Sequence, residues 1–129
     1  MEIALRSALL AWLAADPWLA AELNAVVEEA PLRTSLPWLA IAASASTDWS
    51  VKEAPGREVR IALELHCRGD APDSAAELAG AIEARVEALP RTQPGCHVAS
   101  LQFLRARSEQ RGESRRIILI EYRFRLLAN

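Results

Sequence analysis

Two stretches of alternating apolar and polar side chains constrain the fold more than any other feature of this sequence. One spans residues 58–67 and the other residues 118–126, where the alternation holds for most of the length. Successive side chains of a strand point to opposite faces, so this period predicts two strands that are each buried on one face. The apolar positions are Val59, Ile61, Leu63, Leu65 and Cys67 in the first stretch and Ile118, Ile120, Tyr122, Phe124 and Leu126 in the second.

A different period, typical of amphipathic helices, occupies the N-terminus. The apolar side chains of residues 2–15 form a broad stripe in an Ala-rich background: Ile3, Leu5, Leu9, Leu10, Trp12 and Leu13. Asp16-Pro17 interrupts this helix, because proline disfavours helical geometry in the residue before it. Proline suits the first turn of a new helix, so we expect a short second helix over residues 17–24, capped by Asp16, with Trp18 and Leu19 directed inward.

A longer helix is predicted from Asp73 to Leu89. Ser74 and Glu77 have the spacing of a capping box, in which each side chain bonds the backbone of the other. An apolar stripe follows at helical spacing and ends at Pro90. Its members are Leu78, Ile82, Val86 and Leu89.

Two more strands and their connections complete the expected fold. The apolar run Trp38–Ala45 follows a loop at Pro31–Pro37, and His97–Arg107 directs Ala99, Leu101 and Phe103 to one face. Thr47–Arg57 is a long polar connection, and Ser108–Ser114 is a hairpin turn. At 129 residues the chain predicts one α+β domain, residues 1–129, with a mostly antiparallel four-stranded sheet and two main helices packed on one face.

Charge is distributed unevenly, although the total is only −2. Residues 1–30 hold five acidic and one basic residue, a net charge of −4, whereas residues 101–129 hold seven basic and three acidic residues, a net charge of +4. The two ends neutralise each other within one protomer, or they form head-to-tail contacts between copies in a ring. The sequence leaves both interpretations open.

The sequence contains no motif for nucleotide binding, nucleophilic catalysis or zinc hydrolysis, so we predict a non-enzymatic protein without catalytic residues, cofactor or metal. The nearest approach to a metal site is His66-Cys67 with Cys96-His97, two dipeptides that flank the longer helix and could approach each other at one sheet edge. Adjacent strand residues point to opposite faces, which disfavours a shared tetrahedral metal. We therefore expect buried or edge thiols and surface imidazoles.

The candidate interface residues fall into two groups. Trp49 lies in a polar loop with Asp48 and Lys52, and it either anchors a partner or folds back onto its own domain. The second group is a basic strip at the C-terminal hairpin, directed to solvent or to another subunit. It contains Arg105, Arg107, Arg115, Arg116, Arg123 and Arg125.

An alternative function for the basic hairpin is a small nucleic-acid-binding module, because Arg clusters contact phosphates. The alternation places Tyr122 and Phe124 opposite Arg123 and Arg125, which makes these aromatics core residues rather than platforms for base stacking. The apolar stretch Ala4–Ala15 is too short to span a bilayer and lacks the order of a signal peptide. We expect a cytoplasmic protein with reduced cysteines.

The chain resembles the tail-completion, or tail-terminator, family of long-tailed phages, which has gene transfer agent members. The resemblance covers nearly the whole sequence. It is carried by the segments LLAWLAADPWLAAELN, STDWSVKEAPGREVRIALEL, AAELAGAIEARVEAL and RRIILIEYRFRLL.

This resemblance implies a structural virion or gene transfer agent assembly protein that acts as a tail terminator. It implies a homo-hexamer ring at the head-proximal end of the tail tube, which stops tube growth and joins the tail to the head connector. The implied partners are the major tail tube protein and a head connector or stopper protein, with DNA only as passing cargo and no membrane. Assembly in the cytoplasm would precede incorporation into the particle.

Overall fold

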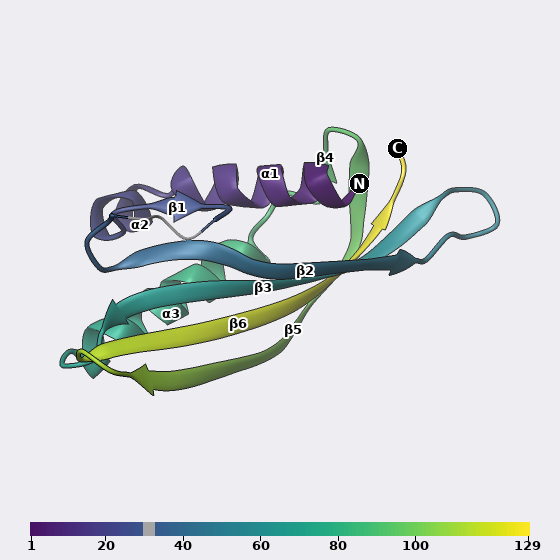
Figure 1. Ribbon diagram of the computed structural model, residues 1–129. Coiled ribbons are helices and arrows are strands. Elements are labelled where there is room, and N and C mark those ends of the chain that lie inside the picture. The colour runs from purple at the N-terminus through teal and green to yellow at the C-terminus, as the bar shows by residue number, and fades with distance from the viewer. Residues whose placement is uncertain (30–32) are drawn as a thin grey trace.

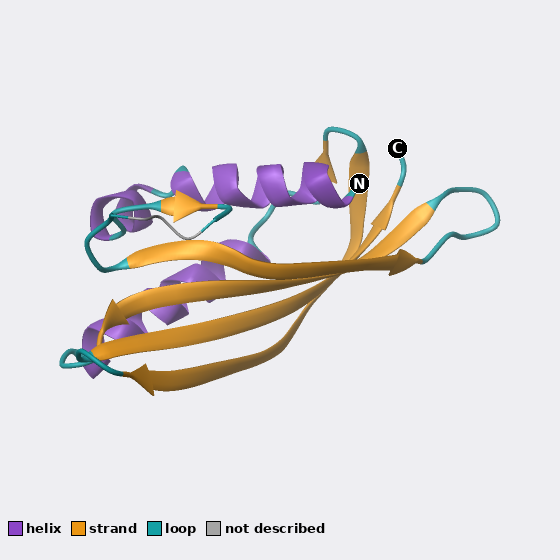
Figure 2. Ribbon diagram, viewed as in Figure 1, coloured by secondary structure: helices purple, strands orange, loops and turns teal. Residues whose placement is uncertain are grey.

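Three helices cover one face of a single twisted sheet in the computed structural model, which describes residues 1–29 and 33–129 (Figures 1 and 2). The helices are α1 (Glu2–Ala14), α2 (Pro17–Glu22) and α3 (Pro72–Glu87). Residues 33–37 have no regular secondary structure, as expected, and the first part of the predicted loop lies outside the described residues. The helices and the sheet share one apolar core, so the mixed α+β class is confirmed.

Within the described residues, the sheet has six strands in the order β1-β2-β3-β6-β5-β4. Four long antiparallel strands form its body: β2 (Trp38–Asp48), β3 (Gly56–Arg68), β5 (Cys96–Arg111) and β6 (Arg115–Leu127). Two short strands flank them, β1 (Val26–Val27), parallel to β2, and β4 (Thr92–Gln93), antiparallel to β5. The predicted four strands and two main helices were therefore incomplete, because a two-residue strand is too short to show a period.

The core face of the sheet follows the two alternating stretches. Cross-strand neighbours in β3 and β6 pair apolar residues along their length, for example Ile61 with Tyr122 and Leu63 with Ile120. All four side chains are almost completely buried. Burial of each such side chain stabilises the fold by about 1.5–3 kcal/mol, so this pair of strands is the centre of the core.

The helices bury narrower stripes than the sequence predicted. In α1 only Leu5, Leu9 and Leu13 are fully buried, because residues four apart share one line along the helix, while Ile3 is 76% exposed. In α2, Asp16 accepts a hydrogen bond from the Leu19 backbone nitrogen at 2.9 Å, which confirms the predicted cap. The expectation that Trp18 points inward was wrong, since it is 39% exposed.

The start of α3 differs from the predicted capping box. Pro72 occupies the first turn and Ala71 is the N-cap, with no side-chain hydrogen bond at the cap. Proline is favoured at this first helical position because its missing N–H costs no bond there, and it places Ser74 inside the helix. The predicted stripe is confirmed, because Leu78, Ile82, Val86 and Leu89 are buried.

Two β-bulges alter the predicted face of β5. Register shifts lie between Val98 and Ser100 and between Phe103 and Arg105. A bulge inserts one extra residue and so changes which side chains face the core. Val98 is consequently buried and Ala99 is exposed, contrary to the prediction. Leu101 packs against the core and Phe103 meets the Tyr122 ring edge-on at 5.7 Å, so both lie on the predicted face, although Phe103 is still 39% exposed.

Candidate protein interface

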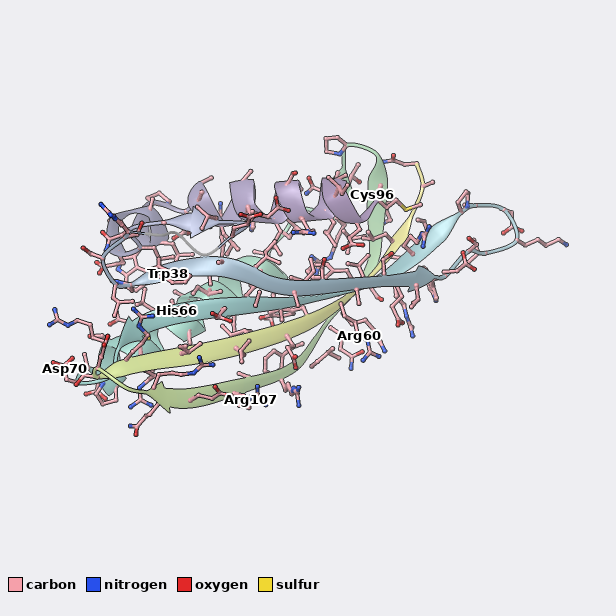
Figure 3. The ribbon with its side chains drawn as sticks, viewed as in Figure 1. Trp38, Arg60, His66, Asp70, Cys96 and Arg107 are labelled. Carbon is pink, nitrogen blue, oxygen red and sulfur yellow. The ribbon has the colours of Figure 1, made fainter. Side chains whose placement is uncertain are left out.

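The face of the sheet that the helices leave open carries most of the predicted basic strip; the exception is Arg116, which lies in one row with the buried Cys67 and so on the helix-covered face. Figure 3 shows the side chains of Arg60 and Arg107 extending from the sheet on the side away from α1. Their neighbours are mostly charged or small, because the polar positions of β3 and β6 share this face. The open face therefore gathers five of the candidate residues: Arg105, Arg107, Arg115, Arg123 and Arg125.

Glu58 organises the centre of this face. Its carboxylate lies 3.1 Å from Nε of Arg125, 3.9 Å from Nε of Arg123 and 3.9 Å from Nε of Arg60. One negative charge thus faces three guanidinium groups, which leaves a local excess of positive charge. Arg123 and Arg125 are half-buried and held in place, so they present an ordered cationic surface rather than freely solvated side chains.

Trp49 folds back onto its own domain, one of the two expected alternatives. Its ring lies 5.5 Å from the guanidinium carbon of Arg125, within cation–π range, and the residue is half-buried. Its backbone nitrogen donates a hydrogen bond to the Gly56 carbonyl at 2.9 Å. A Cβ on Gly56 would lie 2.8 Å from the Leu126 carbonyl oxygen and closer still to that of Trp49, so only glycine fits there.

A polar turn continues from Trp49 to the tip of the hairpin. Asp48, the last residue of β2, accepts a hydrogen bond from the Ser50 hydroxyl at 2.8 Å. The Ser50 hydroxyl oxygen in turn accepts a hydrogen bond from the Gly56 backbone nitrogen at 3.1 Å. Lys52 is exposed beyond these bonds. The predicted long loop is therefore an extended β2–β3 hairpin with residues 49–55 at its tip, at one end of the molecule (Figure 1).

Arg105 and Glu121 form an ion pair beside a hollow in the open face. The hydrogen bond from Arg105 lowers the pKa of the Glu121 carboxyl, and the charges of Arg105, Arg107 and Arg60 add to this effect. The hollow has a volume of about 430 Å³. Its floor contains Ala43, Ala45 and Ala62, and these short side chains give an approaching partner access to the backbone.

The remaining basic residues lie at the opposite end of the sheet, near the β5–β6 turn. Arg107 pairs with Glu109 at 3.1 Å, and Nη1 of Arg116 donates to the Ser108 hydroxyl at 3.2 Å, while Arg115 is half-buried. The nine candidate residues therefore divide among the hairpin tip, the centre of the open face and this turn. Glu58 and Glu121 were missed, because only the strand register reveals that they lie beside these arginines.

The two Cys-His dipeptides do not approach each other. Cys67 pairs with Arg116 of β6, and His97 pairs with Leu127 of the same strand. These two partners are eleven residues apart along β6, so roughly 37 Å along the strand separates the two dipeptides. Figure 3 shows His66 and Cys96 at opposite ends of the molecule. Burial raises the pKa of both thiols.

His66 is buried, contrary to the expected surface imidazole. It is 6% exposed, stacks on Trp38 with 3.8 Å between ring centroids, and contacts Glu64 through Nε2. Within residues 1–29 and 33–129, no three His, Cys, Asp or Glu side chains are grouped closely enough to hold a metal ion. None of the helices in this described part has the length and apolar character needed to traverse a bilayer.

Residues 7–127 match the family described as tail completion protein gp17. The chain belongs to this family. A chain from the solved structure of the virion of a native gene transfer agent particle has the same fold, with a TM-score of 0.78 and 22% sequence identity over 98% of this chain and 97% of that chain. No curated protein matches the sequence. The family resemblance read from the sequence is confirmed, and the matched region of this tail completion protein includes nearly every element of the fold.

Proposed function

We propose that this tail completion protein is a tail terminator: a structural ring, hexameric when assembled, at the head-proximal end of the tail tube. The ring stops tube growth and joins the tail to the head connector. The observation that carries this proposal is the family match over residues 7–127, which extends from α1 to the end of β6. The single domain, residues 1–129, performs this role by binding alone, without cofactor or catalysis.

The shape of the protein supports a role between two different partners. The tip of the β2–β3 hairpin and the β5–β6 turn lie at opposite ends of the sheet (Figure 2). The tip carries Asp48, Lys52 and Glu53, whereas the turn is rich in arginine. Two ends with different chemistry suit one contact with the tube protein and another with the connector, with DNA passing through the ring as cargo.

Aromatic side chains do not support the alternative nucleic-acid module. Tyr122 and Phe124 are fully buried against the helices, so neither ring can stack on a base. The open-face arginines are the remaining candidates for phosphate contact, and several already pair with carboxylates. The structural role is therefore favoured over the nucleic-acid module. We also propose that assembly takes place in the cytoplasm and that the ring then stays in the particle.

The experiment is polymerisation of the major tail tube protein of the same particle, with and without the purified protein, followed by electron microscopy. We expect shorter tubes with a ring at one end, and tube length that falls as the protein is added. Tubes of unchanged length with bare ends would overturn the proposal. Salt-sensitive DNA binding together with unchanged tubes would favour the alternative module instead.

A further inference from the structure

Both edges of the sheet expose long unpaired segments. β1 pairs with β2 only at Leu39 and Ala40, and β4 pairs with β5 only at Cys96 and His97. In the part of the chain that the structure describes, no other strand borders either edge. Figure 1 shows β2 and β5 as the outermost long strands. Unpaired N–H and C=O groups on such edges are ready to pair with another strand.

The free edge of β2 lacks the features that usually prevent such pairing. After its bulge between Ile41 and Ala43, the strand continues regularly from Ala43 to Asp48 with the sequence ASASTD. Edge strands are normally protected by lysine, proline or bulges, and this segment has none of them. The β2 edge is therefore open to a partner strand.

The outward backbone groups of this edge follow from the ladder. The Trp49 backbone nitrogen donates to the Gly56 carbonyl, so the backbone groups of Trp49 point toward β3. In an antiparallel ladder every second residue bonds the same neighbouring strand, so the backbone groups of Thr47, Ala45 and Ala43 point toward β3 as well. The N–H and C=O groups of Ser44, Ser46 and Asp48 consequently point away from β3. A hollow of about 470 Å³ lies beside this segment, and the exposed Ile3 lines it. The space beside the edge includes an apolar side chain for a partner to cover.

The free edge of β5 complements that of β2. Beyond its second bulge, the strand pairs regularly with β6 from Arg105 to Arg111. Arg105, Arg107 and Arg111 outnumber Glu109 on this segment, whereas Asp48 is the one charged residue of the β2 segment. The two edges therefore have opposite net charge and similar length.

We propose that β5 of one copy pairs with β2 of the next, so that the ring is closed by one continuous antiparallel sheet. This inference rests on the proposed ring. The long strands alternate in direction across the sheet, so β2 and β5 run in opposite directions. Copies related by rotation about an axis along the strands keep their directions, and the junction is therefore antiparallel like the rest of the ladder.

The side-chain faces fix the parity of the register. Ala43, Ala62, Glu121 and Arg105 form one row across the protomer. From this row the free segment of β2 runs toward the hairpin tip, whereas the free segment of β5 runs toward the β5–β6 turn. The two segments can therefore pair only if neighbouring copies are shifted relative to each other along the strands. A stagger of about four residues keeps the open faces together and places Arg105 beside Thr47 of the neighbour. Over four strands it gives a tilt of about 35°, within the range of closed barrels.

The first test is Ser46→Pro, with Ser46→Ala as the matched control. Proline removes an N–H that points away from β3, so the fold keeps its own ladder while the junction loses a bond. Analytical ultracentrifugation and electron microscopy with tube protein should show rings and capped tubes for the wild type and Ser46→Ala. Ser46→Pro should melt like the control yet form no rings. Rings and capping by a folded Ser46→Pro variant would overturn edge pairing while leaving the terminator function intact.

A second test does not depend on how Ser46→Pro folds. In the proposed register Ala45 faces Arg107 of the next copy in a non-hydrogen-bonded pair, with Cα atoms about 4.5 Å apart, which suits a disulfide. Ala45→Cys protein mixed with Arg107→Cys protein should give a disulfide-linked dimer in assembled rings, and each variant alone should not. The absence of this dimer in rings that do assemble, or a cross-link to tube protein instead, would overturn the proposal.

Discussion

Replacing Arg85 with alanine should destabilise the protein more than its position near the end of a surface helix suggests. Arg85 of α3 donates from Nε to the Trp12 carbonyl of α1 at 2.9 Å, and its guanidinium carbon lies 3.4 Å from the centroid of the Trp12 ring. The Trp12 indole returns a hydrogen bond to the Arg85 carbonyl at 2.7 Å. The two helices are thus joined by a reciprocal contact, and only the indole bond would survive the substitution.

The expected cost follows from these contacts. The charged hydrogen bond contributes about 1.5–3 kcal/mol and the cation–π contact about 1–2 kcal/mol, because the Arg85 side chain is only 19% exposed. These contributions overlap, so we expect a loss of about 2–4 kcal/mol. For a domain of this size that corresponds to a fall in Tm of roughly 6–14 °C.

Thermal and urea unfolding monitored by circular dichroism would measure this loss. Arg68→Ala is the matched control, because the Arg68 side chain is 73% exposed and lies 3.8 Å from Asp70, whose side chain is 67% exposed. Its loss should stay below about 0.5 kcal/mol. Arg85→Lys keeps the charge but not the planar fork and should fall between the two. If Arg85→Ala has the same Tm and free energy of unfolding as Arg68→Ala, the reciprocal contact does not hold the helices together.

Three further predictions test the sheet and its buried groups. Gly56→Ala should cost about 1–3 kcal/mol in urea unfolding, because its Cβ would meet the Trp49 carbonyl, and wild-type stability would refute that steric argument. Cys67 and Cys96 should react with iodoacetamide far more slowly at pH 8 in the native state than in urea, since burial raises their pKa, and equal rates would show that they are accessible. The pKa of Glu121 is lowered by Arg105, so its contribution to stability is present above the unfolded pKa and is lost as the pH falls through the folded value. Between about pH 5 and pH 3, Glu121→Gln should therefore lose less stability than the wild type, and parallel losses would show that the ion pair does not affect folding.

The parts of the fold that could be predicted from the sequence are those with an uninterrupted period. β3 and β6 keep a period of two over most of their length, and α3 keeps one helical stripe, so their core-facing residues were predicted correctly. The alternation fails at one end of the two strands, where His66 and Ile117 are buried on the other face. β5 was only half predictable, because its bulges change the period within the strand. The short strands β1 and β4 exist only through pairing with longer neighbours, which no local pattern encodes.

The candidate interface shows a similar limit. The nine residues were chosen from the sequence as a loop and a basic strip, and all of them are wholly or partly exposed. Trp49 differs from the others in that its ring packs against Arg125 of its own domain. What the sequence does not encode locally is the register that brings Glu58 between Arg123 and Arg125. Long-range pairing also places the two Cys-His dipeptides at opposite ends, although both flank α3 in the sequence.

A reconstruction of the neck of the assembled particle by electron cryo-microscopy tests the central claim most directly. We predict a ring of copies of this chain between the last ring of the tail tube and the head connector, with the long strands continuing from one copy to the next. A particle that carries this chain at the distal tip of the tail, or that has a complete neck without it, would contradict the assignment as a tail terminator.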